Sequence, residues 1–435
     1  MNAMLLKRVQ LGLVHVAVAM TLVPINSTLN RVMIRELALP ATLVAILASL
    51  PYLFSPVQVV IGSLSDRYSL FGLRRTPYIL AGLLLCVTGV IISPWAAFQL
   101  AEGSAAGILA GLLPFLAWGM GYNLASVCYL ALASELSGEE GRGKTVAVMW
   151  FMMIVSIILT AIGLSRMLDP YTPAALAASF QWVGLAALAL GTLALIGLEP
   201  RGSLPLPASE KPSSRRMAAA ILGNPQAKRF FLYLLLLLAA ILGQDVLLEP
   251  FAAEAFGWTV TQTTRLTSLW GGFVLLAILV AGALERRLSR RLTAQVGNLG
   301  ALAGFLLLIF GGMLRLEGLF YLGVVLLGTG TGLSTVANLA LMFDLTLPGQ
   351  TGLFIGAWGF SNALSRLTGS VLGGALRDLI TAITGNALTG YVVVFAVEAA
   401  MLLMAVLLFG SISVAAFRRR AAELSPAERA SLAVE

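Results

Sequence analysis

The chain has 435 residues, of which 59% are hydrophobic and only 11% are charged, whereas soluble domains carry about 25% charged residues. Its mean hydropathy is +0.92. A soluble enzyme fold could not cover so much apolar surface, and intrinsic disorder requires a polar composition, so both classes are excluded. Repeated apolar runs of about 20 residues predict an α-helical protein that crosses the membrane many times.

The net charge of +8 comes from 28 Lys and Arg residues against 20 Asp and Glu residues. The basic residues are spread over the loops and form no single patch, so nucleic-acid binding is not expected. Cys86 and Cys128 lie in apolar segments, so they indicate neither a disulfide framework nor a zinc site. Lys7 and Arg8 precede a long apolar stretch without a small-residue cleavage site, so we expect a retained first helix and no signal peptide.

The apolar segments predict twelve transmembrane helices in an all-α membrane fold. The segment 199–228 is long, polar and rich in Pro and Ser, which is typical of a linker. It divides the chain into an N-terminal six-helix half (1–198), the linker (199–228), a C-terminal six-helix half (229–414) and a tail (415–435). The predicted spans run near 11–34, 42–62, 77–99, 107–134, 144–167, 175–198, 229–250, 262–284, 292–313, 318–344, 352–376 and 389–414.

The Lys and Arg residues predict the orientation of the chain. Of the 28, 21 fall in one set of loops, and the other seven lie in the opposite set or inside spans. Because cytoplasmic loops carry the excess of Lys and Arg, the linker and both termini are predicted to be cytoplasmic. Arg418–Arg420 follow the last span, which supports an even number of spans.

The two halves repeat each other in sequence. Residues 119–136 match residues 328–345 at an offset of 209, so that Gly121 falls on Gly330 and Glu135 falls on Asp344. A second echo joins GSLSDR (62–67) to GALERR (282–287). Two parallel six-helix repeats resemble the architecture of the major facilitator superfamily, and we expect that fold.

The segment GSLSDRYSLFGLRR (62–75) resembles the signature loop between helices 2 and 3 of that superfamily. Asp66 can pair near a facing helix N-terminus, and Arg67, Arg74 and Arg75 can bridge carboxylates at the helix ends. Contacts of this kind hold one conformational state and break in another. The alternative interpretation is ordinary positive charge in a cytoplasmic loop.

Glu135 and Arg142 follow the fourth span at a spacing of seven, similar to a Glu-x6-Arg element in sugar carriers of the superfamily. In the second half Asp344 keeps the carboxylate, but Thr351 replaces the arginine, so a symmetric gate is not expected. The predicted cytoplasmic gate comprises Asp66, Arg67, Arg74, Arg75, Glu135, Arg142 and Asp344.

Ionisable side chains inside spans are costly and usually face protein or a cavity. Arg366 lies roughly 21 Å into helix 11 at 1.5 Å per residue. It shares a helix face with Trp358 and Asn362. Both a structural ion pair and a contact with a polar ligand group remain open for Arg366.

Two acidic residues lie toward the outer end of the seventh span. Asp245 and Glu249 are one turn apart, and Pro250 interrupts regular helix hydrogen bonding. We expect Arg265 as their partner. Structural pairing and ligand binding are both compatible with this pattern.

Helix 1 carries His15, Asn26 and Asn30 on one stripe. A buried imidazole can ligate the magnesium of a tetrapyrrole, although a lone histidine is more often a hydrogen-bonded core residue. No Walker loop, metal-ligand cluster or hydrolytic triad is recognisable, so no catalytic residue, metal site or enzymatic activity is predicted. The ligand-binding candidates are His15, Asn26, Asn30, Asp245, Glu249, Arg265, Asn338, Asn362 and Arg366.

Several strings resemble one branch of the superfamily, the PucC/LhaA family of light-harvesting assembly proteins. They occur in both halves: TLNRVMIREL (28–37), FGLRRTPYI (71–79), QDVLLEPF (244–251), TTRLTSLWGG (263–272), NLALMFDLT (338–346) and GLFIGAWGFSNALSRLTGSVLGG (352–374). The resemblance implies a factor that binds (bacterio)chlorophyll as cargo and delivers it to antenna polypeptides, without a permanently bound cofactor. It also implies a location in the cytoplasmic or photosynthetic membrane of a phototroph, with pigment synthase as a further candidate partner.

Two other functions remain open from the sequence. A proton-driven carrier for a small solute would need a water-filled cavity with titratable residues, for which Asp245 and Glu249 are the best candidates. A pigment-free assembly scaffold would bind antenna polypeptides alone.

The partition of Lys and Arg predicts the topology directly. Reporter domains fused after Arg215 and after Arg420 should both give the cytoplasmic signal, because both sites lie in the basic set of loops. A periplasmic signal at either fusion would contradict the predicted orientation.

Overall fold

The computed structural model describes residues 3–201, 224–284, 289–345 and 351–423. Within these ranges the regular elements are helices, apart from an isolated bridge between Leu70 and Leu73. The chain is therefore an all-helical membrane protein, as its composition predicts.

Ten helical segments in the described ranges are long and apolar enough to cross a membrane. The expected span 42–62 is divided into α2 (Ala41–Ala48), α3 (Leu50–Leu53) and α4 (Val57–Arg67). Pro51 and Pro56 lack backbone N–H groups and prevent one continuous helix there. The expected span 352–376 lies in the long helix α14 (Thr351–Thr384), which carries the charged residues Arg366, Arg377 and Asp378.

The chain separates into two compact units. Unit 1 comprises Met1–Ser209 and Asp245–Gly272, and unit 2 comprises Glu210–Gln244 and Phe273–Glu435. The segment after the seventh predicted span thus groups with the first unit, because it is bonded there by the polar contacts described below. The division of the chain into halves at 1–198 and 229–414 stays a prediction.

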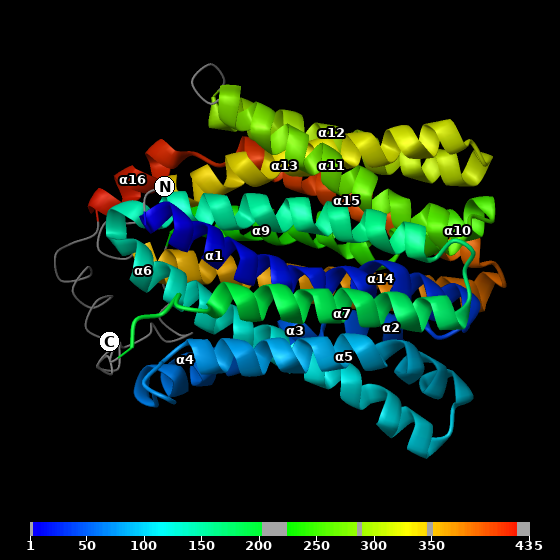
Figure 1. Cartoon of the computed structure of the whole chain (residues 1–435). Helices are drawn as coiled ribbons and strands as arrows, with labels where there is room; N and C mark the ends of the chain where they lie inside the picture. The colour runs from blue at the N-terminus through cyan, green and yellow to red at the C-terminus, as the bar shows by residue number, and fades with distance from the viewer. Residues whose placement is uncertain (1–2, 202–223, 285–288, 346–350, 424–435) are drawn as a thin grey trace. The chain divides into compact units, whose positions relative to one another are not determined.

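Unit 1 is built around helix 1, which runs alongside α6 and α7 (Figure 1). Helix 1 begins as α1 (Ala3–Met20) and continues through the π-helical turns η1 (Pro24–Leu29) and η2 (Val32–Glu36). Gly138 has φ 63°, a left-handed conformation that separates the fourth and fifth predicted spans within α6. The other helices are α5 (Thr76–Glu102), α6 (Ala105–Met167), α7 (Pro173–Leu195), α10 (Leu248–Phe256) and the first part of α11 (Val260–Leu284).

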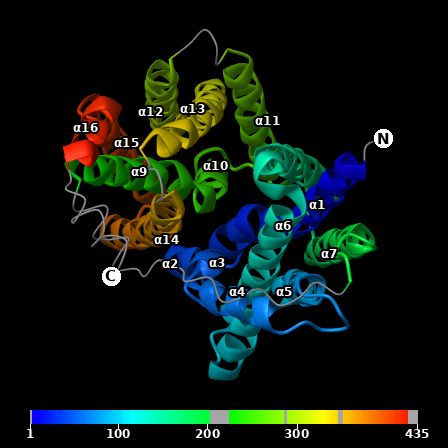
Figure 2. The same cartoon turned by 90° about the vertical axis from the view of Figure 1, so that its left-hand side faces the viewer.

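Unit 2 places α12 beside α13, and α9 beside α14 and α15 (Figure 2). Its core contains fully buried aromatic side chains, and the rings of Phe305 and Phe395 meet edge to face at 5.8 Å. The short 3-10 turn η3 (Gln244–Val246) follows α9. The helices are α9 (Pro225–Gly243), the end of α11, α12 (Arg290–Leu314), α13 (Glu317–Asp344), α14, α15 (Ala387–Gly410) and α16 (Val414–Glu423).

The sequence repeat corresponds to a shared helix crossing in each unit. Gly82 of α5 meets Gly121 of α6, and Gly297 of α12 meets Gly330 of α13. A Cβ on Gly121 would lie 2.6 Å from the backbone nitrogen of Cys86, and a Cβ on Gly330 would lie 2.4 Å from that of Ala301. Small residues at these positions permit the two backbones to approach closely.

Replacing Gly330 with alanine should therefore destabilise the protein. The added methyl group would meet backbone, which cannot move as a side chain can, and such overpacking costs about 1–3 kcal/mol. The melting temperature of the purified Gly330→Ala variant in detergent should fall relative to that of the unsubstituted protein.

Gly318→Ala on the same helix is the matched control, because a Cβ there meets nothing within 4 Å. If both variants melted alike, the close crossing would not contribute to stability.

Candidate functional site

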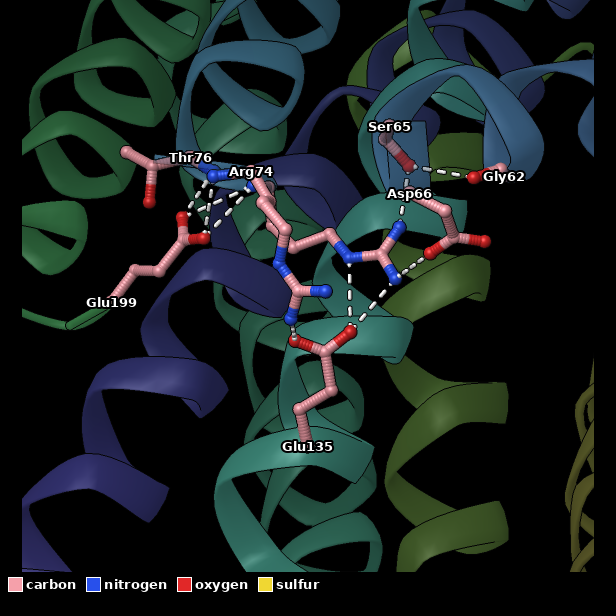
Figure 3. Close-up of polar contacts among 8 residues, drawn as sticks. Gly62, Ser65, Asp66, Arg74, Thr76, Glu135 and Glu199 are labelled. Carbon is pink, nitrogen blue, oxygen red and sulfur yellow. Dashed lines mark hydrogen bonds and ion pairs between the residues drawn. The ribbon is translucent and has the colours of Figure 1, made fainter. Parts of the chain in front are cut away.

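A cluster of charged side chains joins the α4–α5 loop to α6 and to the residues after α7. We call it the α4–α5 cluster, and it comprises Ser65, Asp66, Arg74, Arg75, Glu135 and Glu199 (Figure 3). Arg75 lies at its centre with a side chain that is only 4% exposed. Its Nη2 donates to Asp66 and, at 2.7 Å, to Oε1 of Glu135, while Nη1 donates to Ser65.

Glu135 bridges both arginines. Oε1 also accepts from Nε of Arg75 at 3.1 Å, and Oε2 accepts from Nη2 of Arg74 at 2.9 Å. Figure 3 shows the carboxylate extending from α6 between the two guanidinium groups. Charge-assisted bonds of this kind are stronger than neutral ones, and they hold the start of α5 against α6.

The electrostatics of Arg75 are set by opposing effects. Burial lowers the pKa of Arg75, but the hydrogen bond and charge of Glu135, together with Asp66, outweigh burial and raise that pKa above its ordinary value. Arg75 therefore stays a cation, and its anionic partners are needed to offset the cost of burying it.

Glu199 was not identified from the sequence, in which it marks only the start of the predicted linker. Its carboxylate accepts backbone N–H groups from Arg74 at 2.7 Å, Arg75 at 3.1 Å and Thr76 at 2.7 Å. A negative charge there satisfies N–H groups left unpaired at the start of α5 and complements the helix dipole. Partners more than 120 residues apart leave no local signal in the sequence.

Other predicted gate residues lie outside this cluster. Arg67 and Arg142 are exposed, and within the described residues neither bonds to the cluster's side chains. In unit 2, Asp344 pairs with Arg290 at 2.9 Å. Arg290 is the first residue of α12, much as Arg74 and Arg75 directly precede α5. The second unit therefore has its own contact between an acidic residue and an arginine. It forms although Thr351 occupies the position at which the Glu-x6-Arg element has arginine. Arg286 and Arg287 lie outside the described residues.

A second polar site in unit 1 surrounds Glu249, which is 3% exposed. Ser27 of η1 donates to Oε1 of Glu249, and Thr267 of α11 donates to the same oxygen at 2.7 Å. Oε2 is buried without a hydrogen-bond partner in the described part of the chain. We call Ser27, Glu249 and Thr267 the Glu249 site.

Contacts close to this site tie helix 1 to the α10–α11 segment. Thr28 and Thr264 hydroxyls lie 3.2 Å apart, and Arg31 donates to the backbone oxygen of Trp258 at 2.9 Å while pairing with Glu36. π-Helical turns occur frequently at functional sites, and here η1 presents the Ser27 and Thr28 hydroxyls to α10 and α11.

The expected pairing of Arg265 with Glu249 is corrected by the structure. Arg265 is exposed and donates from Nε to Ser165 of α6 at 3.2 Å, whereas the partners of Glu249 are hydroxyl groups. Asp245 is half-buried and takes part in a polar interaction. Asn30 donates to the backbone oxygen of Asn26 at 2.9 Å, so part of the hydrogen-bonding capacity of this stripe is met within helix 1.

In unit 2, the side chain of Asn338 is engaged in a buried network. Tyr233 donates to Asn338 at 2.8 Å and accepts from Asn298 at 2.9 Å, and Ser334 donates to Asn298 at 2.7 Å. Satisfied networks of this kind fix a unique core. Asn338 therefore has a structural role here.

Trp358, Asn362 and Arg366 do not share one environment. Trp358 is buried with its ring against Phe230, at 5.0 Å between centroids, whereas Asn362 is exposed. Arg366 is half-buried and makes a polar interaction.

His15 is 7% exposed and packs against the rings of Tyr129 and Trp150, with centroids 5.0 and 6.3 Å away. Its Nδ1 is buried without a hydrogen-bond partner in the described residues. Trp150 is 50% exposed, so the imidazole lies one side chain behind the surface of unit 1. Among the described residues, no group of three or more His, Cys, Asp or Glu side chains could hold a metal ion.

Comparison with known proteins places these features in a family. The family model described as PUCC protein matches residues 28–417. Protein PucC of Rhodobacter capsulatus is 31% identical over 91% of this chain and 90% of its own length. Protein PucC of Cereibacter sphaeroides is 33% identical over 92% of this chain and 90% of its own length.

Solved structures with a similar fold are transporters. The nucleoside transporter NupG matches with a TM-score of 0.73 at 14% identity, over 93% of this chain and 99% of its own. A D-xylose-proton symporter matches with a TM-score of 0.68 at 15% identity, over 94% of this chain and 97% of its own. The expected major facilitator superfamily fold is confirmed. At sequence identities of 14% and 15%, the similarity shows the fold and nothing about the substrate.

The geometry of the α4–α5 cluster predicts the behaviour of Asp66→Asn. Arg75 would keep Glu135 and Ser65 as partners, and an ion pair at a partly exposed carboxylate contributes about 0–1 kcal/mol. Protein abundance in the membrane should therefore stay near normal, while function falls because the conformational balance shifts. Immunoblotting measures the abundance, and complementation of a strain that lacks the gene measures the function.

Arg67→Gln is the matched control, because Arg67 is exposed and follows Asp66 directly in the sequence. This substitution should change neither the abundance of the protein nor its function. Loss of accumulation in Asp66→Asn would show that the cluster is structural and that the gate interpretation fails.

Proposed function

Because this chain belongs to the PUCC protein family, we propose that it is a light-harvesting assembly factor that binds (bacterio)chlorophyll and delivers it to antenna polypeptides. The observation that carries the proposal is the family match, which extends over residues 28–417 and so includes both units. Two further relatives support a link to pigment genes by their names. One is called Bacteriochlorophyll synthase 44.5 kDa chain, and the other an uncharacterized protein in the puhA-bchM intergenic region, both from Rhodobacter capsulatus.

The chemistry of the cargo suits a helical membrane carrier. A chlorin with an isoprenoid tail is largely apolar and partitions into lipid, so a carrier needs an apolar path and a few polar anchors. His15 is one such anchor candidate, because its Nδ1 has no hydrogen-bond partner among the described residues and its ring contacts Trp150, which is 50% exposed. An imidazole can serve as an axial ligand of magnesium in the pigment. In unit 2, Arg366 is a separate candidate for contact with a polar group of a pigment.

We propose a carrier and not an enzyme. The similar solved structures are transporters, and the sequence offers no catalytic constellation. A pigment synthase is then a candidate partner of this protein, which would receive pigment from it. The expected place is the cytoplasmic or photosynthetic membrane, with both termini in the cytoplasm and antenna polypeptides as recipients.

A second function is favoured by one observation. The buried carboxyl group of Glu249, with an oxygen that has no hydrogen-bond partner in the part of the chain that the structure describes, suits a proton-coupled carrier of a small solute. A pigment-free scaffold for antenna polypeptides is the third candidate.

Deletion of the gene from a phototroph tests the assembly function. The antenna complex should be depleted and its polypeptides degraded, while pigment synthesis persists or is lowered only by feedback. Absorption spectra of the membranes and immunoblots of the antenna polypeptides measure this result.

Cross-linking in the parent strain, together with solute uptake and export in the deletion strain, separates the three candidates. Cross-links from pigment to this protein's helices support delivery, whereas cross-links from antenna polypeptides alone support the scaffold. Normal antenna together with loss of uptake or export of a small solute would contradict the assembly function.

A further inference from the structure

The surroundings of Glu249 contain hydroxyl groups and lack a counter-charge in contact with it. Ser27 and Thr267 both donate to Oε1, whereas Oε2 is buried and has no hydrogen-bond partner among the described residues. A buried carboxylate anion with an unpaired oxygen is strongly unfavourable, while the protonated acid is neutral and loses far less on burial.

The charged groups around this site are already engaged. Arg31, on the same face of helix 1, pairs with Glu36 and donates to the backbone oxygen of Trp258. Its Nε has no hydrogen-bond partner among the described residues, and its positive charge acts on the Glu249 carboxyl group without contacting it. Arg35 pairs with Glu254 at 3.5 Å, and Arg265 of α11 donates to Ser165.

On α11, Thr263 is buried; its hydroxyl donates to the backbone oxygen of Val260 at 3.1 Å and also acts on the Glu249 carboxyl group. Asp245, one turn before Glu249, can only add negative charge. In the described residues of unit 1 no cation contacts the Glu249 carboxyl group, so its surroundings favour a neutral acid.

We propose that Glu249 is a proton-binding site, and that the bound proton stabilises the contacts of the outer end of helix 1 with α10 and α11. A proton fits better than a metal ion, because Oε2 is buried against protein and a cation would need room for several oxygen ligands. The proton resides on Oε2, because Oε1 accepts both hydroxyl hydrogen bonds.

Loss of the proton would have a defined structural consequence. The new negative charge on Glu249 attracts Arg31, and a movement of Arg31 toward Glu249 would break its contact with the Trp258 backbone oxygen. Since the contact of Arg31 with the Trp258 backbone oxygen and the Thr28–Thr264 pair attach the 245–272 segment to helix 1, deprotonation releases that segment. This inference goes beyond pigment delivery and does not depend on it, because the site and its test involve no pigment.

Infrared difference spectroscopy of the purified protein, recorded as a function of pH, tests the proton directly. A carbonyl stretch from a protonated carboxylic acid should be present near neutral pH and disappear as the pH rises. The band should be absent from Glu249→Gln, whose amide is neutral and nearly the same shape. It should persist in the matched control Glu254→Gln, which removes a partly exposed glutamate of the same helix that pairs with Arg35.

Labelling of a cysteine placed at Thr264 tests the release of the segment. In Thr264→Cys protein the maleimide reaction should become about tenfold faster at high pH, a coupling of ordinary size for a two-state switch. With Glu249→Gln added, labelling should stay slow at every pH. Protein without the Thr264→Cys change corrects for Cys86 and Cys128, both of which are buried.

Two results would overturn the proposal. One is an infrared result: either the unsubstituted protein shows no titrating carboxylic acid band, or the same band survives in Glu249→Gln. The measurement on the unsubstituted protein does not depend on the folding of a variant. The other is labelling that is slowed by sodium chloride and not by potassium chloride at constant pH, which would assign the site to sodium.

Discussion

Two buried arginines set the conditions for the structure around the α4–α5 loop. Arg74 and Arg75 are 6% and 4% exposed, and a buried cation is tolerated only with anionic partners in good geometry. Glu135 of α6 meets both guanidinium groups, and Asp66 meets Arg75. Glu199 takes the backbone N–H groups of the same residues. The loop, α6 and the end of α7 are thus joined at one point, where a change in any partner affects the rest.

The same constraint explains the Glu249 site. Apolar surroundings require each polar group to find its partners within the protein, and hydroxyl groups from η1 and α11 supply them for one oxygen of Glu249. The other oxygen, Oε2, gives the Glu249 carboxyl group two states, protonated and ionised, that differ in the free energy of burial. A protein that must change conformation needs elements with two arrangements of similar free energy, and a buried acid of this kind provides one.

The sequence predicts features that depend on local pattern. Apolar runs placed the helices, the glycine repeat located the close crossings at Gly121 and Gly330, and basic loop residues pointed to Arg74 and Arg75. Glu199, Ser27, Thr267 and Arg290 were missed because their partners are distant in the chain and leave no spacing to recognise. Pairing Arg265 with Glu249 failed for a related reason: proximity in sequence and opposite charge do not determine which way a side chain points. The break in the second span was not predicted, although Pro51 and Pro56 mark it in the sequence.

We propose that this member of the PUCC protein family carries pigment to antenna polypeptides. Reconstitution measures this transfer: the purified protein is loaded with bacteriochlorophyll in lipid vesicles and mixed with vesicles that contain pigment-free antenna polypeptides. The absorption band of assembled antenna should develop faster with the protein than with free pigment at the same concentration. Equal rates with and without the protein, or a protein that retains no pigment through purification of the vesicles, would contradict it.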